Sequence, residues 1–366
     1  MKTIVVSGIN IFRGGTLKIM QECIAALSGY VGDGGNIIAL VHDENLFLKY
    51  DNVRYVAFPK SRRSWFIRLY YEYIGFRRLS KNLKPYLWLS MHDTTPNVVA
   101  CRRAVYCHNP FPFYRPGIRN IFLQPGIAML CLFSYFIYRI NIRRNDFVIV
   151  QQEWLRHEFR GLFGIDNIIV SPPGGIKNSV VKENTATVVR DNANVLFFYP
   201  STPMIHKNME AVCEAAFRLT RAGVKGFEVA FTFDGTENRY AKHIFEKYHD
   251  LAPVRFIGAL SRDGMNEWYA KCDSVIFPSK VETWGLPVSE AKEFGKPVIV
   301  ADLPYARETV GDYGMVKFFD PDEPDELAMV MRQFISGKFT YDPVSAVEYG
   351  QPFAGSWEEL FNIILK

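Results

Sequence analysis

Two glutamates flank the start of a short predicted helix, where their negative charge needs an explanation. Glu282 and Glu290 are separated by seven residues in the stretch "VETWGLPVSEAKEFGKPVIVAD". The proline of its Gly-Leu-Pro step suits the first turn of a helix, because the N–H that proline lacks would have no partner there. Gly295 suits the end of the helix, and Pro297 prevents its continuation. The stretch therefore predicts a helix over 286–294.

This arrangement could bind a diphosphate with hydroxyl groups on both sides of it. The first N–H groups of a helix have no partner within the helix, so its N-terminus binds anions, and Gly285 would let a phosphate approach the backbone. Glu282 and Glu290 would then accept hydrogen bonds from the flanking hydroxyls, which is the pattern of a nucleotide sugar. On spacing alone, Glu282 could equally be a solvated loop residue and Glu290 a partner of the helix dipole.

The elements that must position these residues alternate between strands and helices. Short apolar runs such as "TIVVSG" (3–8), "YLWLSMH" (86–92), "NVLFFYP" (194–200) and "KPVIVAD" (296–302) are joined by helical patterns. Such runs are typical of α/β proteins with parallel sheets covered on both faces. The rhythm breaks at "SPPGGIKN" (171–178), which predicts a linker. We therefore expect two doubly wound, Rossmann-like domains.

The predicted domain boundaries follow from this break. The first domain spans 1–174, the second spans 175–346, and the amphipathic tail 347–366 is expected to pack back on the first. Ligands of doubly wound sheets bind beyond the carboxyl ends of the strands, so a cleft between two facing domains is the default site. Six cysteines without a CxxC pair indicate reduced thiols in a cytoplasmic protein rather than a disulfide scaffold.

Positive charge is concentrated in two aromatic-rich segments. Residues 60–84 hold eight Lys or Arg against one acid, and residues 101–144 hold seven Arg and no acid. This composition is typical of a surface that meets anionic lipid headgroups, although the charges could simply solvate helices whose other face is core. No nucleic-acid-binding motif accompanies the charge, so nucleic acid is not an expected partner. The apolar stretch 121–138 is interrupted at 124–126, and we do not expect it to span a membrane.

The run "FPSKVETWGLPVSEAKEFGKPVIVADLPYARETVGDYG" resembles the signature of retaining GT-B glycosyltransferases of family 4, with Trp284 where Phe is commoner. The segments "VRFIGALSRDGMNEWYAKCDSVIFPS" and "FFDPDEPDELAMVM" also resemble this family, so the resemblance extends over almost the whole chain. It implies the GT-B fold and the retaining transfer of a hexose from a nucleotide-diphosphate sugar. It also implies catalysis without a metal or a cofactor.

The resemblance implies roles for the residues around the predicted helix. Glu282 would bind the donor sugar hydroxyls, and Glu290 would bind the ribose. The backbone N–H groups of Gly285, Leu286 and Val288 would contact the sugar and the diphosphate.

Further roles implied by the resemblance fall outside this helix. Lys207 would neutralise the diphosphate leaving group. His108, in "YCHNPFPF" (106–113), would reach the donor sugar, although a lone strand-end histidine is more often a structural hydrogen bonder. Gly14 and Gly15 would let the first loop approach the diphosphate and the acceptor, and otherwise they form a tight turn before a helix.

The chain departs from the family pattern at one position. The arginine expected near Ser201 to Pro203, which would complete the cationic clamp, is missing. Residues that could compensate for it are His206, Lys280, Arg262 and Arg13. The acidic pair at 320–322 matches an Asp-x-Asp metal pattern, but it precedes a predicted helix whose N-terminus acids would cap. Asp93 is a candidate for acceptor contact or for a turn cap.

The expected acceptor is a lipid-linked glycan or an oligosaccharide. Such an acceptor would explain the basic aromatic segments and would place the protein on the inner face of the cytoplasmic membrane, in O-antigen or other surface polysaccharide assembly. A nicotinamide-dependent dehydrogenase is a competing class, but "GINIFRGG" lacks the spacing of its glycine motif. A non-catalytic sugar-nucleotide-binding or scaffolding protein of the same fold is the other alternative.

Overall fold

The structure, a computed structural model, describes residues 2–175 and 194–366. It divides into two compact units, each containing one parallel sheet. Unit 1 comprises Met1–Asn109, Phe133–Lys177 and Glu348–Lys366, and unit 2 comprises Pro110–Leu132 and Asn178–Val347. The predicted α/β class with two doubly wound sheets is confirmed. The linker predicted over 171–178 lies partly outside the described residues.

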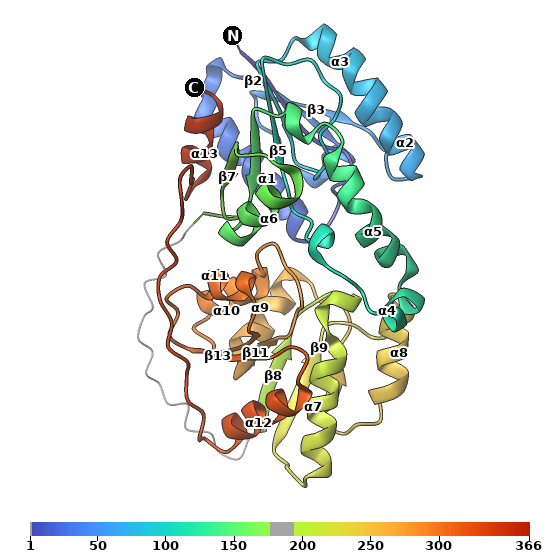
Figure 1. Cartoon of the computed structure of the whole chain (residues 1–366), viewed down its shortest axis with the longest axis vertical. Coiled ribbons are helices and arrows are strands. Elements are labelled where there is room, and N and C mark those ends of the chain that lie inside the picture. The colour runs from blue at the N-terminus through green and yellow to red at the C-terminus, as the bar shows by residue number, and fades with distance from the viewer. Residues whose placement is uncertain (1, 176–193) are drawn as a thin grey trace. The chain divides into compact units, whose positions relative to one another are not determined.

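The sheet of unit 1 has seven parallel strands in the order β3-β2-β1-β4-β5-β6-β7 (Figure 1). The order reverses between β1 and β4, so the carboxyl ends of these neighbouring strands form the switch point of the sheet. Its strands are β1 Thr3–Gly8, β2 Asn36–Val41, β3 Val53–Ala57, β4 Leu87–Ser90, β5 Arg102–Tyr106, β6 Phe147–Val150 and β7 Ile168–Val170.

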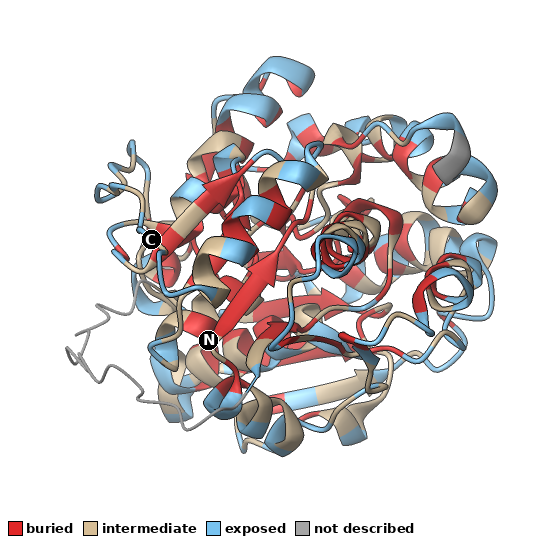
Figure 2. Cartoon of the chain, turned by 90° about the horizontal axis from the view of Figure 1, so that it is seen from below, coloured by how far each residue is buried: buried red, intermediate tan, exposed pale blue. Residues whose placement is uncertain are grey.

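Both faces of this sheet are covered, which explains the uninterrupted apolar strands. Ile4 and Val6 belong to the cluster that includes helix α1, whereas Val5 belongs to the cluster that includes Phe76 of α3. Figure 2 shows most strand residues of this sheet in the colour of buried residues, and the edge strand β3 is the exception, with Val53 alone buried. The helices of unit 1 include α1 Gly14–Val31, α2 Trp65–Tyr70, α3 Phe76–Leu83 and α6 Glu153–Phe163, with a π-helical turn η3, Tyr71–Gly75, joining α2 to α3.

The C-terminal tail belongs to unit 1. Its helix α13, Trp357–Ile364, packs on α1 and buries Leu360, Phe361 and Ile364 in the same cluster. Before this helix, Phe353 forms a parallel bridge with Val170 at the outer edge of β7. The tail is therefore built into the core of the unit.

The sheet of unit 2 has six parallel strands in the order β10-β9-β8-β11-β12-β13 (Figure 1). Its strands are β8 Val195–Tyr199, β9 Phe227–Phe231, β10 Val254–Phe256, β11 Ser274–Phe277, β12 Val298–Ala301 and β13 Val316–Phe319. The helices between them are α7 Met209–Arg221, α8 Arg239–Tyr248, α9 Arg262–Lys271, α10 Leu286–Glu293, α11 Pro304–Val310 and α12 Pro324–Ile335.

One predicted boundary is wrong. The expectation placed all of 1–174 in the first domain, but the segment Pro110–Leu132, here called the arm, belongs to unit 2. The Gln124 side chain accepts a hydrogen bond from the Ile205 N–H at 2.9 Å and donates one to the Pro203 carbonyl at 3.3 Å. The arm also contains helix α4, Ile118–Leu123, which contacts α8. These contacts attach the arm to unit 2.

Helix α5, Pro125–Arg139, is longer than the sequence indicated, because Pro125 begins the helix instead of interrupting it. Within the described residues, one helical stretch, Pro125–Arg144, is long and apolar enough to cross a membrane by length and composition. Its mean hydropathy is 1.3, and 28% of the 18-residue window is buried inside the protein.

Candidate functional site

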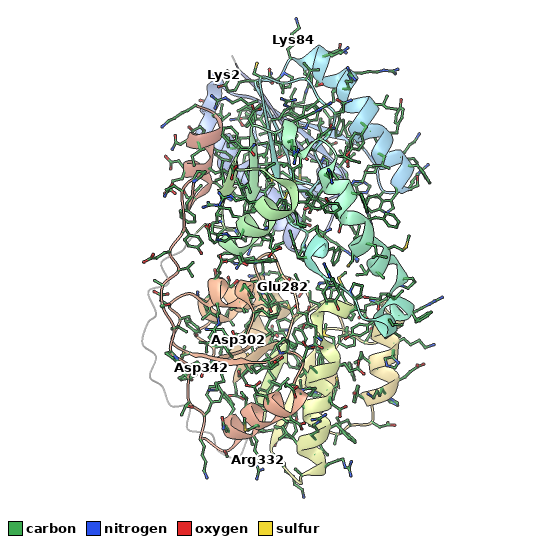
Figure 3. All side chains as sticks on the ribbon, viewed as in Figure 1. Lys2, Lys84, Glu282, Asp302, Arg332 and Asp342 are labelled. Atoms are coloured by element: carbon green, nitrogen blue, oxygen red, sulfur yellow. The ribbon has the colours of Figure 1, made fainter. Side chains whose placement is uncertain are left out.

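The switch point of the unit 2 sheet brings together the two loops that carry the predicted donor-binding residues. Strands β8 and β11 are neighbours although they are far apart in the chain. Lys207 ends the short 3₁₀ helix η6, Ile205–Lys207, after β8, and Glu282 lies in the loop between β11 and α10 (labelled in Figure 3). This topology explains how residues 75 positions apart meet.

Lys207 and Glu282 form an ion pair. The same Glu282 oxygen accepts a hydrogen bond from the Ser279 hydroxyl at 2.6 Å. The side chains of Lys207 and Glu282 are 17% and 13% exposed, so each is largely shielded from water but still accessible. The Lys207 ammonium is already largely removed from water, and the carboxylate holds it in place. It can therefore stabilise a second anion at little further cost in desolvation.

Helix α10 begins as the sequence predicted and ends one residue earlier, at Glu293. Gly285 adopts a left-handed conformation, with φ 89°, which a residue with a side chain rarely adopts. A Cβ atom at this position would lie 3.3 Å from the Phe277 ring, so the turn is also sterically tight. Leu286 and Val288 belong to the first turn of α10, and Val288 is buried. The backbone N–H groups at this helix start can bind an anion.

Glu290 joins α10 to α9. Its Oε1 atom accepts a hydrogen bond from Arg262 at 2.5 Å, and its Oε2 atom accepts one from the Tyr269 phenol at 2.8 Å. Burial raises the pKa of Tyr269 well above its ordinary value, and the Glu290 carboxylate raises it further, so the phenol stays a donor. The Arg262 side chain is 54% exposed, whereas that of Glu290 is 13% exposed. Glu290 is therefore a fixed acceptor one turn inside α10.

The four residues that could compensate for the missing arginine differ in charge, in ion pairing and in the unit to which they belong. Burial lowers the pKa of His206 well below its ordinary value and Lys207 lowers it further, so His206 is neutral near pH 7 and cannot replace a cation. Lys280 pairs with Asp322, and Arg13 belongs to unit 1, where it precedes α1. Arg262, in contact with Glu290, is the candidate that contacts α10.

Unit 1 holds the remaining predicted residues. Gly14 begins α1 with φ 70°, in the left-handed region, and Gly15 follows it in the helix. His108 follows β5 and is buried. Burial lowers its pKa, so the imidazole is neutral near pH 7. The Tyr106 ring stacks on it at a centroid distance of 4.7 Å.

Sequence reasoning missed two partners of His108. The Asp93 carboxylate, predicted only as an acceptor contact or a turn cap, accepts a hydrogen bond from the His108 backbone N–H at 2.5 Å. Gln151, which follows β6, lies with its Nε2 atom 3.2 Å from His108 Nδ1. The signal for Gln151 was a polar residue directly after an apolar strand, "DFVIVQQ", at the sheet edge where His108 was also predicted.

The acidic pair at 320–322 is engaged in local contacts. Asp320 accepts a hydrogen bond from the Asp322 N–H at 2.8 Å, and Asp322 pairs with Lys280. Within residues 2–175 and 194–366, no group of three or more His, Cys, Asp or Glu side chains is arranged to hold a metal ion.

Comparison with known proteins relates the second half of the chain to a glycosyltransferase family. Residues 183–350 match the model of the family described as glycosyl transferases group 1. The chain is 29% identical over 105 residues to O-antigen chain mannosyltransferase B of Escherichia coli, covering 29% of this chain and 27% of that protein. It is 22% identical over 262 residues to O-antigen chain mannosyltransferase RfbU of Salmonella typhimurium (strain LT2), covering 71% of this chain and 67% of that protein.

Solved structures resemble the chain over most of its length. WaaG, a glycosyltransferase involved in lipopolysaccharide biosynthesis, has a TM-score of 0.66 at 14% identity, covering 91% of this chain and 90% of that one. HepE from Anabaena, solved in complex with UDP-glucose, has a TM-score of 0.63 at 14% identity, covering 92% of this chain and 90% of that one. Residues 183–350 therefore match the glycosyl transferases group 1 family, and the chain has the GT-B fold, as expected from the sequence.

Proposed function

We propose that the chain is a retaining glycosyltransferase that moves a hexose from a nucleotide-diphosphate sugar to a lipid-linked glycan acceptor during O-antigen assembly. The observation that carries the proposal is the Lys207–Glu282 ion pair at the switch point of the unit 2 sheet, whose carboxylate lies in the loop that leads into α10. A cation, a carboxylate and a helix N-terminus together match the charges and hydroxyls of a sugar diphosphate.

Each group has a separate task in this proposal. The first turn of α10 binds the diphosphate through backbone N–H groups, and the tight turn at Gly285 lets the phosphate oxygens approach them. Lys207 stabilises the charge that develops on the departing nucleoside diphosphate. Glu282 accepts hydrogen bonds from sugar hydroxyls and Glu290 from ribose hydroxyls.

The reaction exchanges one bond at the anomeric carbon. The bond from this carbon to the diphosphate oxygen breaks, and a bond to the acceptor oxygen forms on the same face. The proton of the acceptor hydroxyl passes to the departing phosphate. Retention follows from attack and departure on one face, and the cations of the site carry the charge without a metal. His108 would donate a hydrogen bond to the transferred sugar.

The relatives support the choice of substrates. Both O-antigen relatives are mannosyltransferases, and the Anabaena structure holds UDP-glucose, so a hexose on a nucleoside diphosphate is the proposed donor. The curated relative of Escherichia coli is matched over 27% of its length, and RfbU is matched over 67%. The O-antigen intermediate is proposed as acceptor on this basis.

An activity panel tests the proposal. The full chain is incubated with UDP- and GDP-hexoses and lipid-linked acceptors, with and without chelator, and released nucleoside diphosphate is measured. We expect acceptor-dependent release that chelator leaves unchanged, and retention in the NMR spectrum of the product. Lys207→Met should abolish this acceptor-dependent release, whereas Lys242→Met, on the exposed face of α8, should leave it unchanged. No release with any donor would favour the non-catalytic alternative, and loss in chelator would contradict metal independence.

We further propose that the protein binds the anionic inner face of the cytoplasmic membrane. The exposed apolar side chains of α5 recur every three or four residues and therefore share one side of the helix. They are Met129, Leu132, Phe133 and Phe136, the last being 59% exposed. Arg139, Arg143 and Arg144 follow them and are exposed. An apolar stripe next to cations suits acyl chains below anionic headgroups.

Helix α2 offers the same combination. Phe66 is 84% exposed, Trp65 and Tyr70 are each 50% exposed, and the basic segment 60–84 surrounds them. Such large apolar side chains are rarely grouped on the surface of a monomeric soluble protein without an interaction partner.

Vesicle sedimentation of the full chain tests this second part. Phe136→Ser should weaken binding to phosphatidylglycerol vesicles by about 10-fold or more, since burying one Phe stabilises by about 1.5–3 kcal/mol. Phe217→Ser is the matched control, because Phe217 is an exposed Phe on α7, outside both basic segments. Equal binding of both variants and the wild-type protein would contradict membrane insertion.

A further inference from the structure

The carboxyl ends of β4, β5 and β6 bring together a set of polar residues around His108. Asp93 lies in the loop after β4, His108 follows β5, and Gln151 follows β6. Since these strands are neighbours in the sheet, the three residues meet at one edge. The proposed donor-binding groups of unit 2 do not include them.

Asp93 holds the backbone at His108. Its Oδ1 atom accepts the His108 N–H hydrogen bond at 2.5 Å. The next residue is held as well, because the Tyr138 phenol of α5 donates to the Asn109 carbonyl at 3.2 Å. One contact precedes the His108 Cα atom in the chain and the other follows it, so the backbone that carries the imidazole is held on both sides.

The backbone of Asp93 is strained. Its φ is 71°, and a left-handed residue other than glycine costs about 1–2 kcal/mol, least for Asp and Asn. Such strain persists only where the surroundings determine the conformation, and it is concentrated at functional sites. A glycine would satisfy the backbone here, so the carboxylate has a separate reason to be present.

A buried hydrogen-bond network keeps the Asp93 loop in this conformation. The neighbouring His92 is buried, with Nε2 3.3 Å from the Ser7 hydroxyl and Nδ1 2.9 Å from the Thr94 hydroxyl. Thr94 donates to Glu72 at 2.6 Å, and Glu72 also accepts from Arg68 at 2.5 Å. A fully connected buried network is rigid, because each broken bond would leave a buried polar group unsatisfied.

Gln151 orients the imidazole ring itself. Its amide Nε2 atom is 3.2 Å from His108 Nδ1 and also hydrogen-bonds the Tyr106 phenol. The Tyr106 phenol donates to the Ser171 carbonyl at 2.7 Å, so its oxygen is available as an acceptor for the Gln151 amide. With the amide donating to both, Nδ1 of the neutral His108 is an acceptor, so the ring N–H that hydrogen-bonds the Met91 carbonyl is on Nε2.

We propose that Asp93 and Gln151 are positioning residues for His108, with Asp93 fixing its backbone and Gln151 fixing the Nε2–H tautomer. The imidazole is then a hydrogen-bond donor through Nε2. This inference rests on the proposed function for its consequence in catalysis, but the tautomer and the backbone contact are properties of the protein without substrate.

A series of substitutions at Asp93 separates the hydrogen bond from the strain. Asn tolerates the left-handed conformation and retains an acceptor oxygen, Gly tolerates the conformation without an acceptor, and Ala has neither. We expect kcat to fall by about 10- to 100-fold in Asp93→Gly and Asp93→Ala, because a small displacement of a catalytic group costs this much. Asp93→Asn should lose less, and KM for the nucleotide sugar should stay unchanged.

Thermal stability distinguishes this role from a merely structural one. The thermal midpoint should be lowest for Asp93→Ala, which loses both the acceptor and the tolerance of the left-handed backbone, and intermediate for Asp93→Gly, which loses the acceptor alone. The proposal predicts low kcat for both variants in spite of this difference. If kcat instead follows the thermal midpoint across the series, with full activity in Asp93→Gly, Asp93 has no positioning role.

NMR of the imidazole nitrogens tests the role of Gln151 without requiring activity. The signals of His108 are assigned in the full chain by comparison with His108→Gln. We expect the Nε2–H tautomer in the wild-type protein, and the Nδ1–H or doubly protonated form in Gln151→Glu, whose carboxylate can only accept. An Nδ1–H wild-type imidazole, or an unchanged one in Gln151→Glu, would overturn the inference. The predicted tautomer in a chain that transfers no sugar would instead contradict the proposed function alone.

Discussion

Replacing Glu290 by Gln should weaken nucleotide binding, and the lost affinity should come only from the contact with the ribose. The amide retains an acceptor oxygen for the Tyr269 phenol, which donates to Glu290 at 2.8 Å, so the buried phenol keeps its partner. The substitution removes the carboxylate that pairs with Arg262. Losing this ion pair costs little folding free energy, because the Arg262 side chain is 54% exposed. The variant should therefore fold, and its thermal midpoint should be close to that of the wild-type protein.

The magnitude follows from the type of hydrogen bond that is lost. A hydrogen bond to a charged acceptor contributes about 1.5–3 kcal/mol, which corresponds to about a 10- to 150-fold change in Kd. Isothermal titration calorimetry with UDP and GDP measures this change in whichever nucleotide binds. The 2′-deoxy forms lack one of the two hydroxyls that Glu290 is proposed to bind, so Glu290→Gln should affect them less.

Glu293→Gln is the matched control. Glu293 is the exposed last residue of α10, so this substitution removes the same charge from the same helix. An equal loss of affinity for the ribose and deoxyribose forms would show that Glu290 acts through the helix or through general electrostatics. An unchanged Kd for both would place the ribose elsewhere.

Three further predictions concern the reaction and the fold. Lys207→Met should lower kcat by about 100-fold or more in the transfer assay, because it removes the cation next to the leaving group; activity within a fewfold of wild type would contradict this role. Phe361→Ala should lower the free energy of unfolding of unit 1 by about 3–5 kcal/mol in urea titrations, because the tail helix is part of the core, and an unchanged midpoint would refute it. Burial lowers the pKa of His206 below its ordinary 6.5, so the unfolded chain binds more protons than the native one as the pH falls below that value. Thermal midpoints should therefore fall on acidification and stay level at higher pH, and His206→Gln should reduce the slope; equal slopes in both proteins would contradict this.

The sequence predicted the helix start at Leu286 because proline and glycine act locally. Pro287 and the left-handed Gly285 fix the turn, and neither requires a distant partner. The parallel sheets were predictable for a related reason, since strands buried on both faces are apolar without interruption.

The residues that sequence reasoning missed are held by contacts across the fold. Gln124 contacts Ile205, 81 positions away, and nothing in the arm indicates that it belongs to unit 2. Gln151 contacts His108 only because β5 and β6 are neighbours in the sheet. Polar side chains of this kind have no periodic pattern, so their partners become visible only when the strand order is known.

Transfer of a labelled sugar tests the central claim most directly. The full chain is given a labelled nucleotide-diphosphate hexose together with membrane-extracted lipid-linked acceptors, and the label in the organic phase is counted. We predict transfer by the wild-type protein and by Lys242→Met, and little or none by Lys207→Met. Nucleotide sugar that binds to the protein without label reaching any acceptor would contradict a transferase.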